Sequence, residues 1–154
     1  MRDTLDRIDR QILTRLQQDG RLSNKELAAA VGLAPSTCLS RVKRLQAGGH
    51  LRGFHADVAP ASLGIGLQAM AFVQLERHTA AHMTDYRARV QVLPEVVASY
   101  HVAGQHDFII HIVARDAAHL RDVIFSLSQP PVQHIQTALI FEHQRTHQLP
   151  DFTR

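Results

Sequence analysis

The spacing of apolar residues changes near residue 50, and this change limits the possible folds more than any other feature of the chain. Before residue 50, apolar residues recur every three or four positions, which is the period of an amphipathic helix. The first such run is Leu5, Ile8, Ile12, Leu13 and Leu16. After residue 50, short apolar runs alternate with helical stretches. We therefore predict an α+β protein with a helical N-terminal domain.

The first fifty residues contain the start and stop signals of three helices. Asp19-Gly20 ends the first helix, and Ser23-Asn24-Lys25-Glu26 is a capping box that begins the second. Gly32 ends the second helix, and Pro35 suits the first position of a third because its missing N–H is not needed there. Gly48-Gly49 ends that third helix. Two helices joined by a glycine turn indicate a helix-turn-helix.

Basic residues are concentrated in the same region. Residues 1–56 contain 10 Lys and Arg against 5 Asp and Glu, whereas residues 57–154 contain 7 against 9. A local excess of positive charge indicates a polyanion as partner. Together with a helix-turn-helix, it predicts binding to double-stranded DNA.

The third predicted helix carries the candidate DNA-binding residues. Its apolar stripe is Cys38, Val42 and Leu45, and we expect the polar side chains to lie on the opposite side. The N-terminal residues of a recognition helix usually meet base edges, and later residues meet the backbone. The predicted base contacts are Ser36, Thr37, Ser40 and Arg41. The predicted phosphate contacts are Lys43 and Arg44. A solvated basic helix in a small bundle is the alternative.

A strand–helix–strand pattern occurs twice after residue 66. The expected strands are 67–75, 96–102, 107–114 and 132–141. Thr79 and Asp116 are plausible N-caps of the two helices between them. The order βαββαβ is that of a ferredoxin-like domain. The predicted organisation is a helix-turn-helix domain at 1–50, an extended linker strand and loop at 51–66, and a βαββαβ domain at 67–154.

The predicted sheet has apolar side chains on both faces. In the first strand, Ala71 and Val73 alternate with Met70 and Phe72. Two helices can cover only one face of a four-stranded sheet, so the other face needs a separate cover. A second copy of the chain is the simplest cover, and we predict an obligate homodimer.

The chain resembles the Lrp/AsnC (feast/famine) family of transcriptional regulators over almost its whole length. The motifs that carry the resemblance include Leu5-Asp6-Arg7-Ile8-Asp9, Asp19-Gly20-Arg21-Leu22-Ser23, Cys38-Leu39-Ser40-Arg41-Val42-Lys43-Arg44-Leu45, Leu51-Arg52-Gly53-Phe54 and Gly104-Gln105-His106-Asp107-Phe108. The resemblance implies a winged helix-turn-helix, a swapped linker strand and a ligand-binding domain. It also implies homodimers that assemble into tetramers or octamers.

The resemblance further implies an amino-acid effector near the turn between the two middle strands. The implied effector-binding residues are Gly104, Gln105, His106, Asp107 and Thr137. Glycine permits a tight turn whose N–H groups could hold a carboxylate, and Asp107 could meet an ammonium group. An ordinary hairpin turn capped by Asp107 is the alternative. Gln105 and Ile135 depart from the family pattern, which frequently has an acidic residue and a threonine there, and either departure can change or remove the effector.

Other function classes lack their motifs in this sequence. Eleven histidines are present, including His78/His82, His101/His106/His111 and His143/His147, but none belongs to a metal-ligand signature. We expect no metal or other cofactor. No nucleophile elbow, phosphate loop or paired-carboxylate motif is present, so we expect no enzymatic activity.

The expected location is the cytoplasm, in association with the nucleoid. No apolar run approaches the ~20 residues that a membrane span requires, and the single cysteine, Cys38, cannot form an internal disulfide. The predicted function is sequence-specific transcriptional regulation that responds to a small molecule. An effector-independent architectural protein that wraps DNA is the alternative, and its binding would be dominated by phosphate contacts.

Overall fold

The structure is a computed structural model that describes residues 5–76, 79–144, 146 and 148–152. The chain forms two compact units, one of Met1–Asp57 with Gln144–Arg154 and the other of Val58–His143. The sequence predicts that 144–154 belongs with the sheet, but the structure groups these residues with the helical unit. One contact within that unit is the hydrogen bond that the Leu149 N–H donates to Gln17 Oε1 at 2.6 Å.

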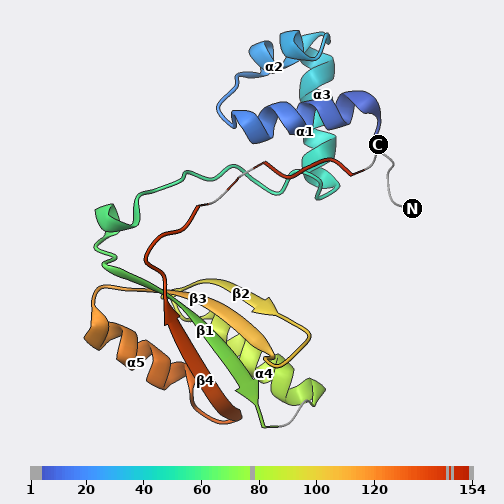
Figure 1. The fold of residues 1–154 in the computed structure, drawn as a ribbon. Helices are drawn as coiled ribbons and strands as arrows, with labels where there is room; N and C mark the ends of the chain where they lie inside the picture. The colour runs from blue at the N-terminus through green and yellow to red at the C-terminus, as the bar shows by residue number, and fades with distance from the viewer. Residues whose placement is uncertain (1–4, 77–78, 145, 147, 153–154) are drawn as a thin grey trace. The chain divides into compact units, whose positions relative to one another are not determined.

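The helical unit contains α1 (Arg7–Gln18), α2 (Asn24–Ala30) and α3 (Pro35–Ala47) (Figure 1). The predicted capping box of α2 is confirmed, because the Ser23 hydroxyl accepts from the Glu26 N–H and Glu26 accepts from the Ser23 N–H. Gly32 has a φ of +69°, a left-handed conformation that glycine adopts without steric cost. The glycine therefore makes the turn between α2 and α3.

The core of the helical unit is built from one apolar side of each helix. Its buried residues are Ile12, Leu16, Leu27, Ala28, Val31, Cys38 and Leu45. Cys38 is fully buried, and burial raises the pKa of its thiol. The predicted packing role of Cys38 is therefore confirmed, and the core fixes which face of α3 points outward.

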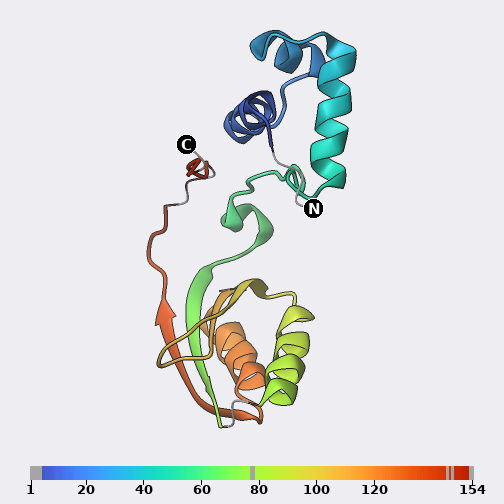
Figure 2. The ribbon, with the colours of Figure 1, turned by 90° about the vertical axis from the view of Figure 1, so that its right-hand side faces the viewer.

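The second unit is a four-stranded antiparallel sheet with two helices. Its elements are β1 (Leu67–Leu75), α4 (Ala80–Gln91), β2 (Val96–His101), β3 (Phe108–Ala114), α5 (Ala117–Leu127) and β4 (Val132–Leu139). The strand order is β2-β3-β1-β4, and both helices lie on one face of the sheet (Figure 2). The βαββαβ prediction is confirmed. The predicted N-caps are also confirmed, because Thr79 accepts from the His82 N–H and Asp116 from the His119 N–H.

The two faces of this sheet differ in burial. On the face covered by α4 and α5, buried strand residues pack with Tyr86, Val90, Val123 and Leu127 of the helices. On the other face, Met70, Phe72, Ile109 and Val113 are only half-buried. We call this second surface the open sheet face. It is the apolar face for which the sequence predicts a separate cover.

The linker is extended and unpaired within the single chain. Residues 51–59 have no regular secondary structure, and a short 3₁₀ helix, η1 (Pro60–Leu63), follows. An extended segment becomes a strand only when a neighbouring strand satisfies its N–H and C=O groups. None of the described strands pairs with residues 51–59. The predicted linker strand is therefore not formed within a single chain.

Candidate functional site

The exposed side of α3 carries most of the predicted DNA-binding residues. Five of the six are exposed: Ser36, Thr37, Ser40, Lys43 and Arg44. At about 100° per residue, the side chains of Ser36, Ser40 and Lys43 lie within about 60° of one another and opposite Cys38. Burial of Cys38 and Leu45 on the other side holds α3 in place. The result is a helix with one packed face and one free polar face.

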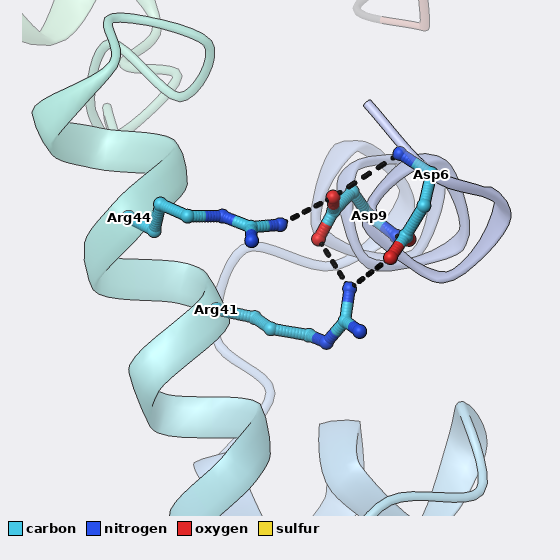
Figure 3. Close-up of polar contacts among 4 residues, drawn as sticks. All are labelled: Asp6, Asp9, Arg41 and Arg44. Carbon is cyan, nitrogen blue, oxygen red and sulfur yellow. Dashed lines mark hydrogen bonds and ion pairs between the residues drawn. The ribbon is translucent and has the colours of Figure 1, made fainter. Parts of the chain in front are cut away.

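Arg41 does not belong to that free face. Its guanidinium donates from Nη1 to Asp6 Oδ2 at 2.5 Å and to Asp9 Oδ1 at 2.9 Å (Figure 3). The predicted position of Arg41 opposite the apolar stripe is wrong, because three residues turn a helix by about 300° and leave Arg41 only about 60° from Cys38. A base contact by Arg41 would require both ion pairs to break.

Asp9 is the centre of this ion-pair network. Its carboxylate is 1% exposed and accepts from Arg41 through Oδ1 and from Arg44 Nη2 through Oδ2, the latter at 2.5 Å. It also accepts from the Asp6 N–H at 3.2 Å, while Asp6 Oδ1 accepts from the Asp9 N–H at 2.8 Å. This reciprocal capping box begins α1. The carboxylates of Asp6 and Asp9 thus cap the N-terminus of α1 and also form the ion pairs that hold α3 against α1.

The electrostatics of the network favour the charged forms. The hydrogen bond from Arg41 lowers the pKa of Asp6 below its ordinary value, with the Asp9 N–H adding to the effect. Hydrogen bonds to Asp6 and then to Asp9 raise the pKa of Arg41. Two of the three cations of α3 are therefore partly neutralised inside the unit. Lys43 is the α3 cation that has no carboxylate partner among the described residues.

This network was not predicted from the sequence, although part of the signal was present. Asp6 and Asp9 belong to a motif of the family resemblance, and no role was predicted for them. Their spacing of three residues is that of an N-cap and N3 pair, which predicts a capping box. Arg41 and Arg44 have the same spacing on α3 and therefore share one side of that helix. The contact between these two pairs depends on how α1 and α3 pack.

The predicted effector turn joins β2 to β3. Gly104 has a φ of +133°, so a side chain at this position would be strained. Asp107 is buried, and its Oδ2 accepts from the Leu75 N–H at 2.8 Å. Its N–H donates to the Val73 carbonyl oxygen, also at 2.8 Å. The carboxylate of Asp107 thus secures the end of β1.

The other predicted effector residues are not brought to a single place within one chain. The His106 ring lies 5.4 Å from the Phe72 ring, and Phe72 belongs to the open sheet face. His106 Nδ1 is buried and has no hydrogen-bond partner among the described residues. Thr137 pairs with Ala71, so its side chain lies on the helix-covered face. The sheet therefore separates Thr137 from His106, and Gln105 is exposed beside Gly104.

The histidines that the sequence analysis grouped together have separate environments. The His101 ring stacks on Phe108 at 5.1 Å, whereas His111 Nε2 is 2.9 Å from Gln68 Oε1. Within the described ranges, no three His, Cys, Asp or Glu side chains are close enough to share a metal ion. His78 and His147 lie outside the described residues.

No helix in the described part of the chain has the length and apolarity needed to cross a bilayer.

Comparisons with known proteins agree with both units. The AsnC-type helix-turn-helix domain matches residues 5–46, and the Lrp/AsnC ligand binding domain matches residues 68–149. The chain is 46% identical over 143 residues to the HTH-type transcriptional regulator AldR of Mycolicibacterium smegmatis, covering 92% of this chain and 84% of AldR. It is 35% identical to the leucine-responsive regulatory protein of Escherichia coli K12, covering 90% and 85%.

Solved structures show the same arrangement of elements. A transcriptional regulator of Neisseria meningitidis in complex with L-Met has a TM-score of 0.86 and 34% identity, over 96% of this chain and 97% of that one. Escherichia coli AsnC has a TM-score of 0.81 and 26% identity, over 94% and 98%. A single chain thus combines an AsnC-type helix-turn-helix with a ligand-binding domain.

Proposed function

Since this chain belongs to the Lrp/AsnC family of transcriptional regulators, we propose that it binds DNA sequence-specifically through α3. The observation that carries this proposal is the free polar face of α3 opposite a packed face. A helix fits the major groove, and hydroxyl groups can bond to base edges there. Ser36, Thr37 and Ser40 make the base contacts, and Lys43 and Arg44 contact phosphates.

Gel-shift titration of a short duplex from an operator tests this assignment. Ser40→Ala should relax preference at one base position, whereas Lys43→Gln should weaken binding to every sequence. Lys43→Gln should also reduce the slope of log K against log salt by about 0.9, the value for one lost phosphate contact. Gln46→Ala, an exposed change in the last turn of α3, is the control. Unchanged binding by both test variants would contradict the assignment.

The effector proposed for the second unit is an aliphatic amino acid. The names of relatives support this class, since one group is called leucine-responsive and one structural relative was solved with L-Met. The positive φ of Gly104 supports a site at the turn, as does His106 Nδ1, which is buried without a hydrogen-bond partner among the described residues. Backbone N–H groups of the turn hold the carboxylate, and the side chain faces the apolar surface near Phe72. Thr137 takes part only from a neighbouring chain.

The effector proposal is tested by light-scattering mass and gel shift with alanine, leucine and methionine. One of them should change the mass or the DNA affinity, and Gly104→Arg should abolish that response while basal DNA binding remains. A response that persists in Gly104→Arg would place the effector elsewhere. No response to any amino acid would favour an effector-independent architectural protein of the nucleoid.

The open sheet face is the proposed dimer interface. Its half-buried apolar residues, Met70, Phe72, Ile109 and Val113, are central on the sheet and not covered by α4 or α5. A symmetric dimer sets two α3 helices about one helical turn of DNA apart, and dimers assemble further into tetramers or octamers. Ile109→Glu should give a folded monomer by light scattering. An unchanged mass in this variant would move the interface to another surface.

A further inference from the structure

The unpaired positive charge of the helical unit is not concentrated on α3. Arg41 and Arg44 are held by Asp9, and they supply two of the basic residues that give residues 1–56 their excess. Arg7 and Arg15 of α1, by contrast, have no carboxylate partner among the residues that the structure describes. The charge that is free to meet a polyanion therefore includes a second surface, on α1.

This second surface is a groove along α1 with a volume of about 740 Å³. Six of its lining residues belong to α1: Arg7, Arg10, Gln11, Thr14, Arg15 and Gln18. We call it the α1 groove. Gln18 lies nine residues after Asp9, which places it about 180° around the helix from the carboxylate that meets α3. The α1 groove therefore faces away from α3, and the network of Figure 3 lies on the other side of α1.

The C-terminal segment of the chain already places an acid in the α1 groove. Asp151 lines it, and two residues earlier the Leu149 N–H bonds to Gln17 Oε1 of α1 at 2.6 Å. Among the lining residues, Asp151 is the acidic side chain set against three arginines. The groove thus has the charge and the hydrogen-bond donors to accept an anionic group, and the chain supplies one from residues 148–152.

The lining favours phosphate over an acidic protein surface. Apart from Ala30, every lining side chain is charged or carries an amide or hydroxyl group. Protein partners usually depend on buried aromatic or aliphatic anchors, and the side chains that line the α1 groove include no aromatic residue and, among aliphatic ones, Ala30 alone. Guanidinium groups match phosphate geometry by donating two parallel hydrogen bonds, and neutral amide and hydroxyl groups add further donors. A row of such donors along one helix fits a phosphodiester backbone.

We propose that the α1 groove is a second DNA-binding site, which contacts backbone phosphates of a DNA segment other than the one that α3 reads. Because the groove faces away from α3, that segment is flanking DNA of the same duplex that bends around the protein. Asp151 competes with phosphate for the groove, so the C-terminal segment limits this contact. The inference rests on DNA binding by α3 and adds to it a contact that carries no base information.

The test compares salt dependence on a short duplex of about two helical turns with that on a duplex of about 150 base pairs. The full-length Arg7→Gln/Arg15→Gln variant removes the two unpaired groove arginines. The matched control, Arg21→Gln/Arg52→Gln, removes two exposed arginines of the same unit that do not line the groove. Both variants lose the same net charge, so a general electrostatic effect would change them equally.

On the long duplex, Arg7→Gln/Arg15→Gln should lower the slope of log K against log salt by about 1.8, for two lost phosphate contacts. When the salt is raised from 50 to 200 mM, the affinity of this variant should therefore fall about twelvefold less than the affinity of the unchanged protein. On the short duplex the slope should not change, and the control variant should keep its slope on both. Asp151→Asn should tighten binding to the long duplex alone.

Two results would overturn the second site. One is an unchanged slope on the long duplex for Arg7→Gln/Arg15→Gln, which would leave the groove to the C-terminal segment or to a protein partner. The other is an equal loss in both double variants, which would reduce the effect to net charge. Failure of the unchanged protein to distinguish sequences on the short duplex would instead contradict DNA reading by α3, so the two failures are separate.

Discussion

The two units of this protein hold their helices by different means. In the helical unit the helices are held by a small apolar core and, in addition, by the buried carboxylate of Asp9, which binds Arg41 and Arg44. In the sheet unit α4 and α5 are held by a larger apolar core that includes Tyr86 and Phe108, whose rings lie 5.1 Å apart. Apolar contacts depend on buried area and respond to salt and pH much less than ion pairs do. The helical unit, which carries the basic residues, is therefore the unit whose internal contacts respond to salt and pH.

The largest expected effect lies in the apolar unit. Phe108→Ala should lower the free energy of unfolding by about 3–5 kcal/mol, because it removes a fully buried ring and leaves a cavity. Chemical denaturation, followed through the unfolding transition of the sheet unit, measures this loss in free energy. Phe125→Ala, at a side chain that is 71% exposed, is the control and should change little. Equal effects of the two substitutions would show that the core does not lie where the structure puts it.

In the helical unit, Asp9→Asn should cost about 2–3 kcal/mol, because two arginines lose a buried anionic partner. It should also reduce discrimination between DNA sequences, since α3 is no longer fastened to α1. Denaturation and gel shift measure the two effects. Asp122→Asn, in an exposed pair with Arg121, is the control for loss of a carboxylate. Unchanged stability in Asp9→Asn would mean that the apolar core alone sets the position of α3.

Asp107 provides a buried carboxylate within the apolar unit for comparison. Asp107→Ala should destabilise the sheet unit by about 1.5–2 kcal/mol, because the Leu75 N–H loses a charged acceptor at the end of β1. Gln105→Ala, at the exposed position of the same turn, should be nearly neutral. Denaturation of both variants measures the difference. An effect of Asp107→Ala on effector response with full stability would instead assign this carboxylate to the ligand.

The smallest effect is a pH dependence in the helical unit. The hydrogen bond from Arg41 lowers the pKa of Asp6 below its ordinary value of 3.8. The stability that Asp6 contributes is therefore complete above about pH 4 and is lost as the pH falls through its lowered folded-state pKa. Asp6→Asn keeps the N-cap but removes the charge. Its melting temperature should be a few degrees below that of the unchanged protein at pH 7, and the gap should narrow as the pH falls below 4.

A gap that stays constant from pH 7 to pH 3 would contradict the ion pair between Asp6 and Arg41. In that case the two proteins would differ only in how well Asp and Asn cap α1, and the charge of Asp6 would contribute nothing. Thermal melts followed by circular dichroism at pH 7, 5, 4 and 3 test this prediction. The quantity compared is the difference in melting temperature between the two proteins at each pH. Exposure of Asp6 keeps the effect small, since water screens the pair.

The elements of the fold were predictable because their signals are local. The capping box at Ser23, the N-caps at Thr79 and Asp116 and the turn at Gly32 each depend on residues within one helical turn. The helical orientation of Arg41 also follows from its spacing to Cys38, and the prediction that placed it opposite the apolar stripe was wrong. The linker strand expected within 51–66 stays a prediction, because a swapped strand requires a partner from another chain that local sequence does not specify.

Part of the candidate site was likewise within reach of the sequence. The exposed polar residues Ser36, Ser40 and Lys43 follow from periodicity, and Gly104 follows from the chemistry of a tight turn. The separation of Thr137 from His106 could not be predicted in this way. It depends on which face of the sheet each side chain takes, and that is set by the register of β4 on β1.

The sequence by itself determined the helices, the strands, their order and the basic character of the first third, since all of these depend on residues close together in the chain. Only the tertiary structure decided which arginines of that third are free. Asp9 meets Arg41 across 32 residues, and Gln17 meets Leu149 across 132. Such contacts are set by how whole elements pack, which depends on the shape of the complete core and not on any local pattern.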